Sequence, residues 1–108
     1  MIEIRHYVDR SGKDVFDDWL LDLPDLRAQA KIAARINRLA VANFGDCKAL
    51  GGGVSELRIH WGPGYRVYFA PIGKVCVLLL CGGDKRKQAA DIERAICFLR
   101  DYKERLTP

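Results

Sequence analysis

Two neighbouring segments of the sequence carry side chains that could handle a phosphodiester. Residues 54–61 and 65–70 each alternate between apolar and polar side chains, which is the two-residue period of a strand with one buried face. Between them lies Gly62-Pro63-Gly64, a combination typical of a tight turn. The polar positions of the two segments hold Arg58, His60, Arg66 and Tyr68.

A three-residue turn at 62–64 would bring these four side chains to one face of a hairpin. It sets up the pairs Trp61 with Tyr65, His60 with Arg66, Ile59 with Val67, Arg58 with Tyr68 and Leu57 with Phe69. Every pair then matches in polarity, whereas a slip of one residue would mix the two faces. We therefore expect the polar side chains to converge, with cross-strand neighbours about 5 Å apart.

The residue types in this group suit RNA cleavage without a metal ion. Arginine binds phosphate oxygens through two donors and stabilises charge that grows in the transition state. Histidine takes or gives a proton near neutral pH, and tyrosine can stack on an unpaired base. The hypothesis from the sequence is that Arg58, His60 and Arg66 are catalytic, that Tyr68 binds RNA, and that no cofactor is needed.

A basic run after the apolar segment 75–81 adds to this group. Residues 51–108 hold 10 basic and 6 acidic side chains, while residues 1–50 hold 8 of each, so the whole net charge of +4 lies in the second half. A basic surface on one half of a small domain suits a polyanion. We expect Lys85 to join the catalytic group, and Arg86 and Lys87 to bind RNA. The alternative stays open, because outward Arg and Tyr side chains and charge runs before helices are often simply solvated.

The hydrophobic periodicity of the whole chain predicts an α+β domain. Strands are expected over residues 2–8, 54–61, 65–70 and 75–81, and helices over 14–23, 25–44 and 88–106. Gly45 is expected to cap the second helix, and residues 47–53, which include three consecutive glycines, to form a flexible connection. The expected order is β-α-α-β-β-β-α, an antiparallel sheet with helices on one side. The 108 residues are enough for one domain.

Composition argues against several other classes of protein. The longest apolar run has seven residues, far fewer than the ~20 that cross a bilayer, and residues 1–5 lack the pattern of a signal peptide. The four cysteines are scattered without a Cys-x-x-Cys motif, so we expect reduced thiols and no zinc site. These features predict a cytoplasmic domain with no metal ion and no membrane partner.

The sequence also resembles a known family. The resemblance is carried by Glu56-Leu57-Arg58, by residues 62–69, by residues 82–88 and by Asp91-Ile92 with Ala95, and it spans nearly the whole chain. In these motifs the sequence resembles the RelE/ParE toxin superfamily, and within it the phage-type addiction-module killer proteins of a HigB-like branch. The resemblance implies a single RelE-like domain over residues 1–108, the toxin of a type II toxin–antitoxin pair.

The resemblance further implies an activity and partners. RelE-like members cleave mRNA without a metal ion, commonly in the ribosomal A site, and are held inactive by a small antitoxin, here expected to be of the helix-turn-helix type. Arg66 matches the strand arginine that stabilises the phosphate, and Arg58 matches a basic residue on the preceding strand. Lys85 or Lys87 matches the basic position after the last strand.

Departures from the family pattern leave alternatives open. RelE has a lysine-rich second strand and a catalytic tyrosine near its C-terminus, whereas this sequence offers Arg58 and His60, and its Tyr102 lies well along the last helix. The general base and the dependence on the ribosome therefore stay undecided. One alternative is a ParE-like inhibitor of DNA gyrase without nuclease activity. Another is an inactive toxin-derived module that only binds RNA or its partner.

Overall fold

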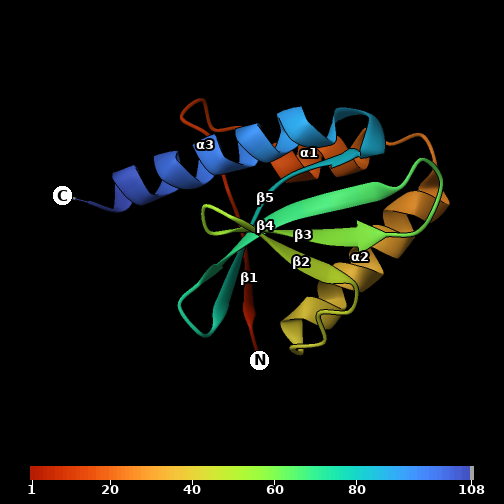
Figure 1. Ribbon diagram of the computed structural model, residues 1–108, viewed down its shortest axis with the longest axis horizontal. Coiled ribbons are helices and arrows are strands. Elements are labelled where there is room, and N and C mark those ends of the chain that lie inside the picture. The colour runs from red at the N-terminus through yellow and green to blue at the C-terminus, as the bar shows by residue number, and fades with distance from the viewer. Residues whose placement is uncertain (108) are drawn as a thin grey trace.

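The computed structural model describes residues 1–107 as an α+β domain (Figure 1). Its elements, in chain order, are β1 (Glu3–His6), α1 (Val15–Leu21), α2 (Leu26–Ala40), β2 (Cys47–Gly51), β3 (Val54–Ile59), β4 (Tyr65–Ile72), β5 (Cys76–Asp84), the single 3₁₀ turn η1 (Lys85–Lys87) and α3 (Gln88–Leu106). The predicted α+β class is confirmed, but the predicted order β-α-α-β-β-β-α was wrong, because β2 adds a strand between α2 and β3. No helix within residues 1–107 combines the length and the apolar content that a membrane span requires.

The five strands form one mixed sheet in the order β1-β5-β4-β3-β2. Strands β2 to β5 pair antiparallel, but β1 runs parallel to β5. The expectation of a purely antiparallel sheet was therefore wrong for the first strand. Alternation along a strand indicates which face is buried, and carries no information on the direction of the neighbouring strand. The strand predicted over residues 75–81 corresponds to β5, which lies between β1 and β4.

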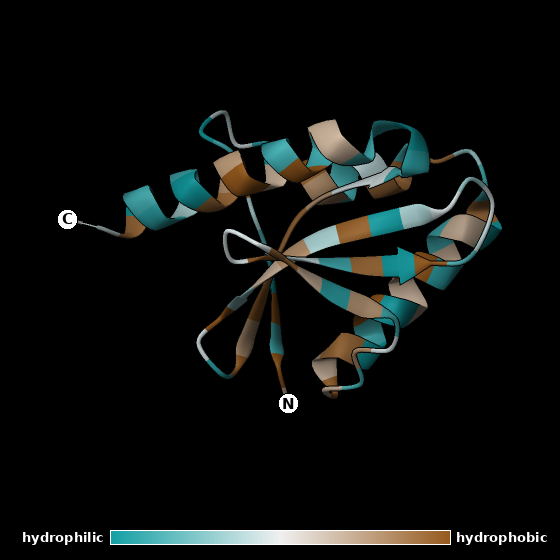
Figure 2. Cartoon of the chain, viewed as in Figure 1, coloured by the Kyte–Doolittle hydropathy of each residue, from teal (hydrophilic) through white to brown (hydrophobic). Residues whose placement is uncertain are grey.

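Helices cover both faces of the sheet, and not one face as expected. On one face, α1 and α2 pack over alternate residues of β3 and β4, such as Leu57 and Val67. On the other face, α3 packs over residues that include Val54 and Tyr68. Figure 2 shows the alternation of hydrophobic and hydrophilic residues along β3. The polar positions of β3 and β4 therefore share their face with α3, and the part nearest that helix is covered.

The segment expected to be a flexible connection contains an edge strand. Strand β2 pairs with β3, with a register shift between Ala49 and Gly51, and a turn with φ of 95°, 63° and 82° at Gly51, Gly52 and Gly53 joins the two. Positive φ values of this size favour glycine because it has no Cβ. The glycines that suggested flexibility are therefore the residues that a tight hairpin requires.

The predicted starts of the helices agree with the structure better than the predicted ends do. Asp25 accepts hydrogen bonds from the amides of Arg27 and Ala28, which is how an N-cap begins a helix. Helix α2 ends at Ala40, before the expected boundary at Phe44, and Ala42 takes a φ of 63°. Gly45 is therefore not its cap. Helix α3 covers 88–106 as predicted.

Candidate functional site

The hairpin of β3 and β4 has a register two residues away from the expected one. Arg58 lies opposite Arg66, and Ile59 lies opposite Tyr65, so the loop contains five residues instead of three. A shift of two keeps every side chain on its face, because the side-chain period of a strand is two. Polarity matching therefore excludes a one-residue slip but cannot detect this one. His60 consequently lies in the loop and is not paired with Arg66.

Two arginines face each other across the hairpin, and a buried carboxylate lies beside both. Glu56 is fully buried, and its Oε1 accepts hydrogen bonds from Nε of Arg66 and, at 2.9 Å, from Nε2 of Gln88. Arg66 is itself buried and also donates through Nη1 to the carbonyl oxygen of Gly64 at 2.8 Å. Burying a charge is costly unless it is paired, so Glu56 and Arg66 each make the burial of the other tolerable.

Arg58 is held less tightly than Arg66. Its Nε lies 3.6 Å from Oε2 of Glu56, and its Nη1 lies 4.0 Å from Oδ1 of Asp46. Within residues 1–107, Nε of Arg58 and Oε2 of Glu56 are both buried without a hydrogen-bond partner. The guanidinium of Arg58 is therefore attracted by two carboxylates. Its two Nη atoms form no hydrogen bond within residues 1–107, so they can bind an incoming anion, whereas the buried Nε cannot.

His60 forms a pair with a residue that the sequence did not single out. Its Nε2 lies 2.5 Å from Oδ2 of Asp46, and this hydrogen bond is the main cause that lowers the pKa of the Asp46 carboxyl below its ordinary value. Because an ionised carboxylate only accepts hydrogen bonds, Nε2 of a neutral His60 carries the hydrogen and Nδ1 keeps a free lone pair. The His60 side chain is 77% exposed, so that lone pair can reach a ligand in solution.

A pocket of about 390 Å³, which we call the hairpin pocket, brings most of the expected residues together. It is lined by Arg58, Ile59, His60, Trp61, the loop residues 62–64, Tyr65, Arg66 and Lys85. Lys85 belongs to η1, and its methylene groups lie close to Gly64. The four candidate catalytic residues therefore share one pocket, whose charged lining side chains are basic.

The three residues expected to bind RNA directly are not in the pocket lining. Arg86 and Lys87 lie on the exposed turn η1 beside Lys85, and Arg86 pairs with Asp84 at 2.8 Å. Tyr68 lies opposite Glu56 and is fully buried under α3. Burial raises the pKa of its hydroxyl, which has no hydrogen-bond partner within the described residues. The idea that its ring stacks on a base therefore needs correction, because α3 occupies that side of the sheet.

Comparison with known proteins gives one relative. No protein-family model matches the chain. A protein of Haemophilus influenzae named "Uncharacterized protein" is 56% identical over 80 residues, which are 74% of this chain and 81% of that protein. The chain belongs to the same family as this protein.

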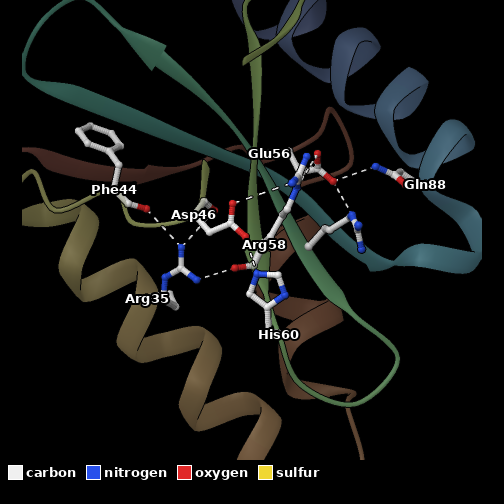
Figure 3. A network of polar contacts seen from close by, with 8 residues as sticks. Arg35, Phe44, Asp46, Glu56, Arg58, His60 and Gln88 are labelled. Carbon is white, nitrogen blue, oxygen red and sulfur yellow. Dashed lines mark hydrogen bonds and ion pairs between the residues drawn. The ribbon is translucent and has the colours of Figure 1, made fainter. Parts of the chain in front are cut away.

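The residues that hold the two arginines in place were not predicted from the sequence. Figure 3 shows a network that extends from Arg35 on α2 through Asp46 and Arg58 to Glu56 and Gln88 at the start of α3. Arg35 donates to the carbonyl oxygens of Arg58, Phe44 and Asp46, at 2.5, 3.2 and 3.2 Å. These residues come from four segments: α2, the segment before β2, strand β3 and the first turn of α3.

Only a partial signal for these residues exists in the sequence. Glu56 and Gln88 fall inside the motifs that carry the family resemblance, but nothing in the spacing links them. Asp46 is brought to His60 because its carbonyl oxygen accepts from the amide of Arg58, 3.0 Å away, at the beginning of the β2–β3 pairing. That pairing was not expected, so the Asp46–His60 pair was not predictable either.

Proposed function

We propose that this protein is a RelE-like toxin of a type II toxin–antitoxin system and that it cleaves mRNA without a metal ion. The observation that carries the proposal is that Arg58 and Arg66, directly opposed, line one pocket with His60, whose ring is hydrogen-bonded to Asp46. The family resemblance of the motifs and the α+β fold support the RelE-like assignment. A cognate helix-turn-helix antitoxin in the cytoplasm belongs to the same proposal, and the assay below compares cleavage with and without the ribosome.

In the proposed reaction the ribose 2′-oxygen attacks the adjacent phosphorus, and the bond from phosphorus to the 5′-oxygen breaks. The products are a 2′,3′-cyclic phosphate and a 5′-hydroxyl end. Nδ1 of His60 takes the proton of the 2′-hydroxyl, and water supplies a proton to the leaving 5′-oxygen. Negative charge grows on the non-bridging phosphate oxygens, where the donors of Arg58 stabilise it.

Three further residues position the side chains of the pocket and do not contact the RNA themselves in this scheme. Asp46 orients the ring of His60 and fixes which nitrogen is free, because its carboxylate accepts from Nε2. Glu56 holds Arg66 in place, and Gln88 holds Glu56. Donors that are fixed before the substrate arrives need no reorganisation during the reaction. Lys85 adds positive charge on the far side of the pocket.

The test is cleavage of a message by purified protein, mapped by primer extension with and without ribosomes. We expect cut ends that carry a 2′,3′-cyclic phosphate, and a rate that EDTA does not change. Loss of a general base costs about 10²- to 10⁴-fold, so His60→Ala should slow cleavage by about that factor, and Arg58→Ala by a similar one.

Two controls make this test specific. Arg100→Ala removes an exposed arginine on α3 and should leave the cleavage rate unchanged. Asp46→Asn keeps the size of the side chain but should shift the pH–rate profile, because it removes the charge that His60 faces. Full cleavage by both His60→Ala and Arg58→Ala would overturn the mechanism. Growth arrest with inhibited supercoiling and no RNA cleavage would instead favour the gyrase alternative.

A further inference from the structure

A second depression lies next to the hairpin pocket, along α2. This α2 groove has a volume of about 460 Å³ and is lined by Ala30, Lys31, Ala34, Arg35, Arg38, Ile59 and His60. All the charged residues in this lining are basic. Ala30 and Ala34 have small side chains, so a ligand can approach the helix closely between the cations.

The α2 groove and the hairpin pocket meet at two residues. Ile59 and His60 line both, so a ligand that leaves the pocket past His60 enters the groove. Figure 3 shows Arg35 on α2 and His60 on the hairpin loop, both in contact with Asp46. The guanidinium of Arg35 is fixed there by the carbonyl oxygen of Arg58. The groove is thus connected to the pocket by a residue of the proposed site itself.

The positive charge of the groove is not neutralised by its own side chains. The sequence of α2 contains four basic residues and no acidic one. Within residues 1–107, Lys31, Arg35 and Arg38 form no ion pair with a carboxylate. Lys31 lies 4.5 Å above the ring of Trp61, and Arg35 donates to carbonyl oxygens. Asp46, the acid at the junction, is engaged by His60 and Arg58.

We propose that the α2 groove binds the backbone phosphates of a single-stranded RNA whose cleaved linkage lies in the hairpin pocket. The proposal rests on the proposed function for the identity of the cut strand. Lys31 and Arg38 are seven residues apart, or about 10 Å along the helix, which provides separate contacts for successive phosphates. The pocket and the groove join at Ile59 and His60, at the end of β3. A basic groove that follows the phosphate backbone is how proteins bind a single strand, whose exposed phosphates can enter both depressions.

Binding of a labelled 2′-O-methyl RNA of about 12 nucleotides, followed by fluorescence anisotropy at several salt concentrations, tests the groove. This probe lacks the 2′-hydroxyl nucleophile, so binding is measured without cleavage. Each phosphate contact contributes about −0.7 to the slope of log K against log salt for single strands. We expect Lys31→Ala/Arg38→Ala to reduce the magnitude of the slope by about 1.4. The matched control, Arg100→Ala/Lys103→Ala on α3, removes two exposed cations and should leave the slope unchanged.

Cleavage assays with RNAs of different length then distinguish binding in the α2 groove from the chemical step in the hairpin pocket. A dinucleotide that fills only the hairpin pocket should be cut by Lys31→Ala/Arg38→Ala at the wild-type rate, while a longer RNA should be cut more slowly at low concentration. An unchanged salt slope, or no RNA binding by the wild type, would overturn the groove proposal; an acidic protein segment would then be the better occupant. Absence of cleavage by the wild type, with the expected change in slope, would overturn the proposed nuclease and leave the groove standing.

Discussion

At the scale of single residues, the buried carboxylate of Glu56 determines how the two arginines differ. Arg66 is buried and hydrogen-bonded to Glu56, whereas the Arg58 side chain is 34% exposed and forms no hydrogen bond to Glu56. Arg58 is therefore the better probe of phosphate binding. Replacing Arg66 changes stability as well as charge, so loss of the proposed RNA cleavage in an Arg66 variant would not by itself demonstrate a catalytic role.

We predict that Arg66→Ala lowers the free energy of unfolding by about 3 kcal/mol, because it leaves the Glu56 carboxylate buried without its partner. Adding Glu56→Gln removes that charge, so the double variant should be less destabilised than the sum of the single variants. Urea unfolding of the four proteins measures this coupling. Strict additivity would contradict the pairing.

Gly45 lies in a position that only glycine fits without strain. Its φ is 61°, and a Cβ at this residue would lie 2.9 Å from Nη2 of Arg35. We predict that Gly45→Ala destabilises the protein by about 1–2 kcal/mol, through the left-handed backbone and the displaced guanidinium. Gly73, which also has positive φ but open space around it, is the matched control. Thermal unfolding should show a larger loss for Gly45→Ala than for Gly73→Ala.

At the scale of elements, α3 packs its first turn against the end of β5. Asp91 is buried there, so close to Gly83 that a Cβ on that glycine would lie 2.0 Å from its Oδ2. Burial raises the pKa of Asp91, although its ion pair with Arg94 at 3.3 Å opposes this. The contact between α3 and β5 therefore contains a carboxyl group whose protonation stabilises the folded state. The same helix supplies Gln88, which donates a hydrogen bond to Glu56.

This gives a pH-dependent prediction. Because the pKa of Asp91 is higher in the folded than in the unfolded chain, its contribution to stability is fully present below the unfolded value near 3.8 and is lost as the pH rises through the folded value. Asp91→Asn cannot titrate, so its stability relative to the wild type should improve from pH 3.5 to pH 7. Asp18→Asn on the exposed side of α1 controls for the lost charge, and urea unfolding at both pH values is the measurement. A relative stability that falls with pH would contradict the assignment.

At the scale of the whole molecule, one sheet is shared by two hydrophobic cores. Trp19 and Trp61 both pack against the core on the α2 side, while Leu99 of α3 is buried in the other. Because every strand from β3 to β5 contributes to both cores, we expect the domain to unfold as a single cooperative unit.

We predict that Leu99→Ala lowers the free energy of unfolding by about 2–5 kcal/mol. Tryptophan fluorescence, which reports the α2 side, and far-UV circular dichroism should shift together to lower urea concentration. Exposed Cys97 on the same helix provides the control variant Cys97→Ala, which should change little. A fluorescence transition that stays in place while the dichroism shifts would show that the two cores unfold separately.

The sequence by itself determined the α+β class, α3 and the common face of Arg58 and Arg66, because these depend on periodicity within continuous segments. It did not determine the register of the hairpin, because a shift of two residues keeps every side chain on the same face of the sheet. Nor did it determine the burial of Tyr68 or the pairing of Asp46 with His60, since these depend on where α3 and β2 dock. Only the tertiary structure decides which polar side chains of a strand stay accessible, because that depends on the elements that cover its face.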